Sequence, residues 1–317
     1  MTLNKKHWLI ILLVNMIVFC GIFWGQYIKL TDISTDGNKR TTDGKATNII
    51  ACLDDAVIFI ENGKINMVMP VDIEKQKDYF YLFWWNNLVE INSIDGNCIS
   101  GIDEEGNLHF WGDCCSFCYE LVDKRDKYIK AIATNSYVGM LAQNNKVTVA
   151  FSRYNDFYKS IENIYSSWDN IVDFEMNPQC MVALKSDGHV KYVAEKDFLY
   201  KDVNSWKQIT DIALTDNGYI IGCDINGKIL LSGGLSENNG QLIRHALKWE
   251  KVKKICSSNG ILIGLRHDGK VCACGNICQD DIEEVEKWIS IKDIAIGTRY
   301  VAGIDKDNGV HILYLKE

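Results

Sequence analysis

The chain has 317 residues, 47% of them hydrophobic, so it is long enough to bury a sizeable core. Its formal net charge is −8. This charge excludes nucleic acid as a partner of the whole surface, because phosphate binding needs a positive field. Proline is rare, whereas β-branched and aromatic residues are common, and this balance favours a sheet protein.

Residues 8–27 form a nearly uncharged apolar run, which predicts one transmembrane helix. Lys5 and Lys6 precede it, so we expect residues 1–7 in the cytoplasm and the rest of the chain outside it. Cleavage of this run, as a signal peptide or at Cys20 as a lipoprotein, is the alternative. The residues around Cys20 lack an A-x-A-like site, and bulky Phe19 departs from a lipobox. We therefore predict an uncleaved anchor in the cell membrane, followed by a flexible linker over residues 28–45.

Tryptophans recur along the remaining chain at intervals of roughly 40 residues, a period typical of repeat architectures. Each is followed three residues later by an aliphatic residue that begins an apolar stretch. The recurring residues are Trp85, Trp168, Trp206, Trp249 and Trp288.

The second half of each copy has the pattern of a β-hairpin. Short apolar stretches flank Asn-Gly or Asp-Gly, whose residues accept the positive φ angles of tight turns. A small residue precedes each turn and is expected to allow close packing. These small residues are Gly101, Gly139, Ala183, Gly222, Gly264 and Gly303.

Counting the copies gives seven units within residues 46–317. They begin near Ala46, Trp85, Tyr128, Trp168, Trp206, Trp249 and Trp288. Each unit is too small to bury its own sheet, so the units must stack. We predict an all-β propeller of seven blades, each with four antiparallel strands, in which the first copy supplies the outer part of the last.

These features resemble the RCC1-like (regulator of chromosome condensation) repeat family over residues 46–317. The leading tryptophan, the glycine before the hairpin and the Asp/Asn-Gly-x-Val turn carry the resemblance, with Asn239-Gly240-Gln241-Leu242 similar to a further family element. WD40 repeats fit less well, because no Gly-His and Trp-Asp pair recurs. The resemblance implies a propeller that acts through protein contacts, here as a bacterial-type, membrane-anchored member.

The twelve cysteines do not form a recognisable zinc motif. Cys223, Cys272 and Cys274 fall on strand positions that other copies fill with core residues, so we interpret them as small hydrophobic residues. Disulfides or a metal site remain the alternatives, with Cys114, Cys115 and Cys118 as the best candidates. His109 and His311 occupy equivalent strand positions, which favours a structural role.

No nucleophile, phosphate-binding or zinc-protease motif occurs in the sequence. We therefore predict a non-enzymatic protein-binding module without a cofactor, monomeric outside the membrane. The alternative is an enzyme or lectin-like module that acts on cell-wall or host glycans. Irregular connections differ most between copies and carry aromatic side chains suited to an interface. The candidate binding residues are Phe117, Tyr119, Tyr154, Phe157 and Tyr158.

Overall fold

The strands of the chain form seven small sheets, each built from three consecutive antiparallel strands. The structure is a computed structural model. It describes residues 48–54, 56–68, 79–93, 96–112, 126–134, 136–151, 156–195, 200, 202–216, 218–233 and 243–315. The described residues all belong to one compact unit, residues 46–317. The predicted anchor lies outside the described residues, and within these residues no helix has the length and apolar character needed to span a bilayer.

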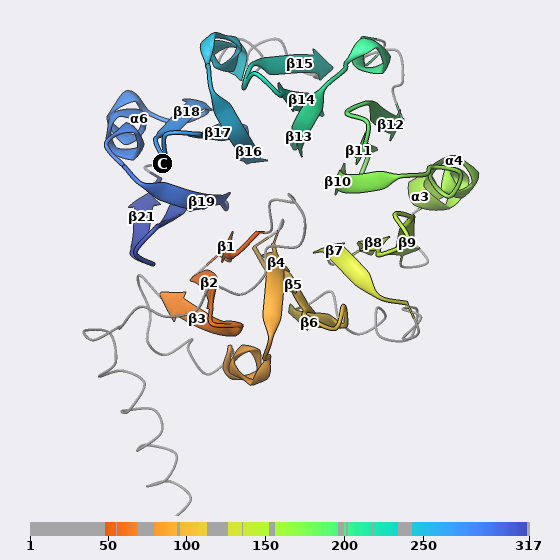
Figure 1. Cartoon of the computed structure of the whole chain (residues 1–317), viewed down its shortest axis with the longest axis horizontal. Helices are drawn as coiled ribbons and strands as arrows, with labels where there is room; N and C mark the ends of the chain where they lie inside the picture. The colour runs from red at the N-terminus through yellow and green to blue at the C-terminus, as the bar shows by residue number, and fades with distance from the viewer. Residues whose placement is uncertain are drawn as a thin grey trace, which may run out of the picture. The chain divides into compact units, whose positions relative to one another are not determined.

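The seven sheets lie around a common axis, and the first strand of each sheet is the innermost (Figure 1). The first strands are β1 (Ile50–Cys52), β4 (Leu88–Asn92), β7 (Tyr128–Ala133), β10 (Ile171–Asn177), β13 (Ile209–Leu214), β16 (Val252–Ser258) and β19 (Ile291–Ile296). The second strands are β2 (Val57–Glu61), β5 (Cys98–Asp103), β8 (Tyr137–Ala142), β11 (Cys180–Lys185), β14 (Tyr219–Asp224), β17 (Ile261–Arg266) and β20 (Tyr300–Asp305). The third strands are β3 (Lys64–Val68), β6 (Leu108–Gly112), β9 (Val147–Phe151), β12 (Val190–Ala194), β15 (Ile229–Gly233), β18 (Val271–Gly275) and β21 (Val310–Tyr314).

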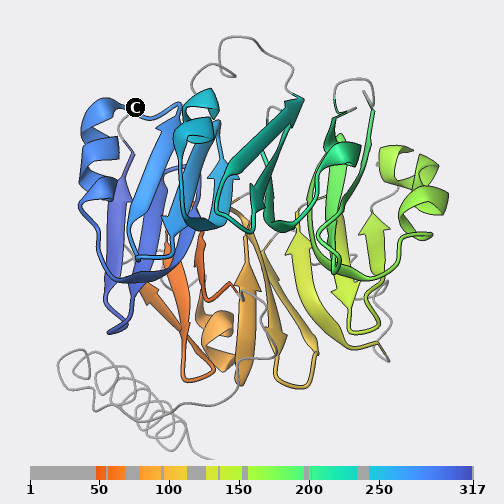
Figure 2. The ribbon, with the colours of Figure 1, turned by 45° about the horizontal axis from the view of Figure 1, so that its top comes forward.

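The prediction of seven units is confirmed, but each sheet has three strands in the described part of the chain where we expected four. Five connections that follow a third strand contain short helical segments, which lie on the outer side of the sheets (Figure 2). The segments are η3 (Phe80–Trp84), α3 (Asp156–Ser160) with α4 (Glu162–Tyr165), η5 (Val203–Ser205), η6 (Arg244–Lys248) and α6 (Gln279–Glu286).

The recurring tryptophan and glycine pack directly on each other. A Cβ atom added to Gly222 would lie 2.9 Å from Cζ3 of Trp206, and one added to Gly264 would lie 2.9 Å from Cζ3 of Trp249. These distances are shorter than real carbon contacts, so a side chain at Gly222 or Gly264 would force the indole ring to shift. Gly101 faces Trp85 at the same distance, Gly303 faces Trp288 with a Cβ distance of 3.2 Å, and Ala183 is fully buried at the matching position.

Two units lack the tryptophan, and both carry a large residue where the other five have glycine or alanine. Phe59 stands at this position in β2, and Met140 stands there in β8, as the strand registers show. Gly139 therefore does not match Gly101, as the sequence suggested, but lies one residue earlier and faces Phe174 and Met176 of the next sheet. The larger side chains of Phe59 and Met140 therefore take the place of the missing indole ring.

Neighbouring sheets are joined by a repeated backbone hydrogen bond. The first residue of an inner strand donates its N–H to the hairpin carbonyl of the preceding sheet, at 2.9 to 3.1 Å. The pairs are Leu88–Gly63, Tyr128–Gly106, Ile171–Asn145, Ile209–Gly188, Val252–Gly227 and Ile291–Gly269. Gly227 has φ +74°, and a Cβ atom there would lie 2.4 Å from N of Val252. Asn145, which replaces glycine in the weaker third copy, adopts φ 63°, a conformation that asparagine tolerates.

Within the described residues the ring closes without exchanging a strand. The last sheet consists of β19, β20 and β21, so the expectation that the first copy completes it is wrong for the described residues. Instead, β1 packs against β19 and β20, and Cys52 and Phe59 share an apolar cluster with Tyr300 and Ile304. The N–H of Ile49 donates to Oδ2 of Asp293 at 2.7 Å. Closure therefore rests on side-chain packing and hydrogen bonds.

Candidate functional site

Three of the predicted binding residues, Phe117, Tyr119 and Tyr154, lie outside the described residues. The other two lie in α3, on the outer side of the fourth sheet. Phe157 is partly buried, whereas the side chain of Tyr158 is fully buried.

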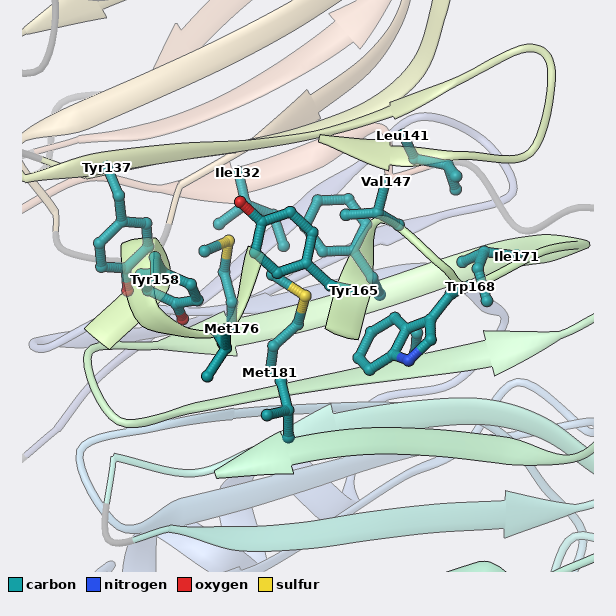
Figure 3. Packing of buried hydrophobic residues seen from close by; sticks show 14 residues of the cluster. Ile132, Tyr137, Leu141, Val147, Tyr158, Tyr165, Trp168, Ile171, Met176 and Met181 are labelled. Atoms are coloured by element: carbon teal, nitrogen blue, oxygen red, sulfur yellow. The ribbon is translucent and has the colours of Figure 1, made fainter. Parts of the chain in front are cut away.

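Tyr158 is a core residue, so our interpretation of it as an exposed interface aromatic is wrong. Its hydroxyl donates to the carbonyl oxygen of Asn177 at 2.5 Å and lies 3.2 Å from that of Cys180, and its ring lies 5.0 Å from that of Tyr137 (Figure 3). Burial raises the pKa of Tyr158 well above its ordinary value. Tyr158 therefore anchors α3 to β10 and β11 of the fourth sheet. Its hydroxyl has the hydrogen-bond partner that a buried tyrosine needs.

Two aromatic side chains that the sequence analysis did not select are strongly exposed. Tyr81 and Trp84 lie three residues apart in η3 and expose 69% and 68% of their surface. Residues at this spacing eclipse in a 3-10 helix, so both rings lie on one face. Val68, at the end of the neighbouring β3, exposes 36%. The aromatic run Phe80-Tyr81-Leu82-Phe83-Trp84-Trp85 could have indicated this surface, but only its last tryptophan was considered, as a marker of the repeat.

A ring of six charged residues lies on the innermost strands, one from each sheet except the first. We call it the axial ring: Glu90, Lys130, Asp173, Asp211, Lys254 and Asp293. Each follows a β-bulge at which two residues of the first strand oppose one residue of the second. Bulges redirect side chains, and their repetition here places a charge at the same point of each sheet.

Most charges of the axial ring are paired across sheets. Nζ of Lys130 donates to Oδ1 of Asp173 and to Oε1 of Glu175, both at 2.7 Å. Nζ of Lys254 donates to Oδ1 of Asn48 at 2.6 Å and also binds Asp293. These two lysines link the third sheet to the fourth, and the sixth sheet to the seventh and first.

The remaining two carboxyl groups have neutral hydrogen-bond donors. Oε1 of Glu90 accepts from Nδ2 of Asn92 at 2.7 Å, and Oδ2 of Asp211 accepts the backbone N–H of Ile255 at 2.6 Å. Burial raises the pKa of Glu90 to about 7 and that of Asp211 to about 7, and the negative charge of Asp173 adds to both effects. Burial lowers the pKa of Lys130, but Asp173, Glu175 and Glu90 more than offset this and raise it.

We expect Glu90→Gln to stabilise the protein at pH 8 but not at pH 5. The raised pKa means that the folded state holds a proton between about pH 4.5 and 7 that the unfolded chain releases. Stability therefore falls as pH rises through this window. Glutamine keeps the acceptor for Asn92 and removes this loss, which is on the order of 1–3 kcal/mol.

Urea unfolding of both proteins at pH 5 and pH 8 measures this difference. Glu104→Gln, at an exposed hairpin residue, serves as the control and should leave stability nearly unchanged at both values. An equal effect of Glu90→Gln at both pH values would contradict the expected titration.

Most cysteines in the described part of the chain are buried. Its eight cysteines form no disulfide, and Cys223, Cys272 and Cys274 lie in one apolar cluster, as predicted. Burial raises the pKa of each of these three thiols to about 12, which makes them poor nucleophiles. Cys114, Cys115 and Cys118 lie outside the described residues. No group of three or more potential ligands among the described residues could hold a metal ion.

His109 and His311 repeat the same local arrangement in the second and seventh sheets. Nε2 of His109 lies 3.1 Å from Oδ2 of Asp103, and Nε2 of His311 lies 2.9 Å from Oδ2 of Asp305. Each imidazole ring also lies beside the recurring tryptophan of its sheet. The predicted equivalence of the two histidines is therefore confirmed.

No family model matches the sequence, and no curated protein matches it. Solved structures do match. The CRINKLY WD40 ectodomain of the Arabidopsis thaliana receptor kinase ACR4 aligns with a TM-score of 0.58 at 12% identity, over 84% of this chain and 95% of that one. Yeast RCC1 (Prp20), solved bound to Kap60, aligns with a TM-score of 0.52 at 13% identity, over 90% and 86% of the two chains. The fold is a β-propeller.

Human WBSCR16 gives a TM-score of 0.54 at 12% identity, over 80% of this chain and 79% of that one. At such low identities the likeness establishes the propeller architecture alone. The matched structures include both an RCC1 protein and a propeller described as WD40. The seven sheets of the described residues form its blades, first to seventh in chain order.

Proposed function

We propose that this propeller is a protein-binding module of the RCC1-like repeat type. The observation that carries the proposal is the pair of exposed aromatic rings, Tyr81 and Trp84, on one face of η3 between the first and second blades. Large aromatic side chains dominate the binding energy of protein interfaces, and two neighbouring rings with more than two thirds of their surface exposed are costly to leave in water.

The double variant Tyr81→Ala/Trp84→Ala is expected to reduce partner capture at least tenfold without lowering the melting temperature. Affinity capture from cells of the source organism, quantified by mass spectrometry, measures this effect. Ile289→Ala is the matched control, because Ile289 exposes 64% of its surface beside a different blade. If both variants capture the same proteins in the same amounts, the η3 surface is not the interface.

We further propose that residues 8–27 anchor the protein in the cell membrane and that the propeller lies outside the cytoplasm. Lys5 and Lys6 before the apolar run support this orientation. Protease added to intact cells is then expected to degrade the propeller and to spare the N-terminal segment. Protection until the cells are lysed would reverse the orientation, and a mature N-terminus beyond residue 20 would exclude the uncleaved anchor.

A glycan-cleaving enzyme is the second candidate, and the convergence of carboxyl groups at the axis favours it. Glu90 and Asp211, each with a pKa of about 7, have the protonation behaviour of acid–base catalysts. Against this candidate, Glu90 is only 6% exposed, and Asp173, Glu175 and Asp293 are bound to lysines. Loss of a measured glycosidase activity in Asp211→Asn, with the melting temperature retained, would establish it.

A further inference from the structure

The third strand of the seventh blade has an unusual burial pattern. β21 reads Val310-His311-Ile312-Leu313-Tyr314, without a charged residue or a proline. Among the seven third strands of the described chain, it is the one with no fully buried residue. Proteins usually protect such edges with lysine, proline or a covering segment, because an open edge pairs readily with another chain.

The hydrogen-bond register shows which backbone groups of β21 face outward. Leu315 donates its N–H to the carbonyl of Arg299 at 3.0 Å, and Gly309 accepts the N–H of Asp305 at 2.9 Å. Alternate residues of an antiparallel strand bond to the same neighbour, so Val310, Ile312 and Tyr314 direct their N–H and C=O groups away from β20. No described residue outside β21 bonds to these outward groups.

The helix beside this edge is strongly acidic. α6 packs against β18 and also contacts β21 on the outer side of the ring (Figure 1). Its eight residues, Gln-Asp-Asp-Ile-Glu-Glu-Val-Glu, include five carboxylates, and Asp280, Glu283, Glu284 and Glu286 are exposed. This negative charge disfavours pairing with a second copy of the chain, because two such helices would repel each other. It favours a positively charged partner.

We propose that the outer edge of β21 binds an extended segment of a partner protein as a fourth strand, and that lysine or arginine residues flank the apolar part of this segment. Main-chain hydrogen bonds to Val310, Ile312 and Tyr314 provide affinity, as in other complexes formed by strand addition. The basic flanks interact with α6 and select the partner. This inference rests on the proposed function as a binding module but uses a surface separate from Tyr81 and Trp84.

A labelled peptide, Lys-Thr-Val-Thr-Ile-Thr-Val-Lys, titrated into the propeller and followed by fluorescence anisotropy, tests the proposal. We expect saturable binding that weakens with added salt. The same peptide with N-methyl groups on alternate backbone nitrogens, made in both registers, should bind at least tenfold more weakly in one register. The charge reversal Glu283→Lys/Glu286→Lys should weaken binding several-fold and reduce its salt dependence. Undetectable binding at millimolar peptide, or equal affinity for all three peptides, would overturn the proposal.

The variant Ile312→Pro removes one outward N–H without breaking a bond to β20, so the fold should persist. Ile312→Thr is the matched control, because threonine is β-branched and keeps the N–H. We expect at least tenfold weaker peptide binding for proline and little change for threonine. A dimer in sedimentation equilibrium that Ile312→Pro abolishes would mean that the edge pairs with itself, against the proposal. Tyr81→Ala/Trp84→Ala should bind the peptide normally, so failure here and failure of the proposed function are distinguishable.

Discussion

Replacing Gly222 by valine is expected to lower the free energy of unfolding by about 3 kcal/mol, or to prevent folding altogether. A Cβ atom added at this position would lie 2.9 Å from Cζ3 of Trp206, and valine carries two methyl groups on that atom. The strand backbone cannot move away, because β14 pairs with strands on both of its sides, and the indole ring of Trp206 is buried in an apolar cluster. Urea denaturation followed by tryptophan fluorescence measures the loss.

The chain itself suggests the compensating change. In the first and third blades, Phe59 and Met140 occupy the glycine position and no tryptophan precedes the inner strand. Gly222→Met should therefore be strongly destabilising alone, whereas Trp206→Leu together with Gly222→Met should recover part of the loss. A double-mutant cycle gives the coupling energy directly. Losses that simply add would show that the two positions do not share one packing site.

Lys254→Met should destabilise the protein by about 3–5 kcal/mol, the usual cost of leaving a buried charge without its partner. The methylene groups of methionine fill similar space, but Asp293 loses its cation and Asn48 loses a donor. The affected residues lie where the sixth and seventh blades meet the first. We therefore expect unfolding to begin at the closure of the ring, seen as faster hydrogen exchange in β1 and β19.

Two variants control this experiment. Lys253→Met makes the same substitution one residue away, at a partly buried lysine of the bulge, and should have a much smaller effect. Lys254→Met/Asp293→Asn removes both charges and keeps an acceptor for the N–H of Ile49. It should be more stable than Lys254→Met alone. If the double variant is less stable, the lysine acts by packing and not by pairing.

The repeat could be predicted from the sequence because its signals are local. Tryptophan, glycine and the hairpin turn recur at a fixed spacing, and these residues do build equivalent contacts in the second, fifth, sixth and seventh blades. The third blade misled the sequence analysis, because Gly139 and Met140 are adjacent and only the strand register shows which one matches Gly101. A shift of one residue moves a side chain to the opposite face of the sheet.

The features that could not be predicted depend on contacts between distant parts of the chain. Tyr158 and Trp84 are both aromatic residues in a connection, and only the packing of each helical segment makes one buried and the other exposed. The axial ring likewise cannot be recognised as a sequence motif, because residues that pair in it, such as Lys130 and Asp173, are far apart in sequence and each follows a bulge. Burial and partner, not residue type, decide their roles.

Among the described residues no strand is exchanged at the ring closure, and this has a consequence for how such a chain can change its length. In the described residues each sheet is a continuous stretch of sequence, joined to its neighbours by a few backbone hydrogen bonds, apolar packing and side-chain contacts. Duplication or deletion of a whole repeat would leave every remaining sheet with all of its own strands. Only the angle between adjacent sheets would have to adjust, by a small rotation shared among all the joints. The number of blades is thus set by geometry at the joints, and a gene encoding this architecture can gain or lose a unit without rebuilding its ends.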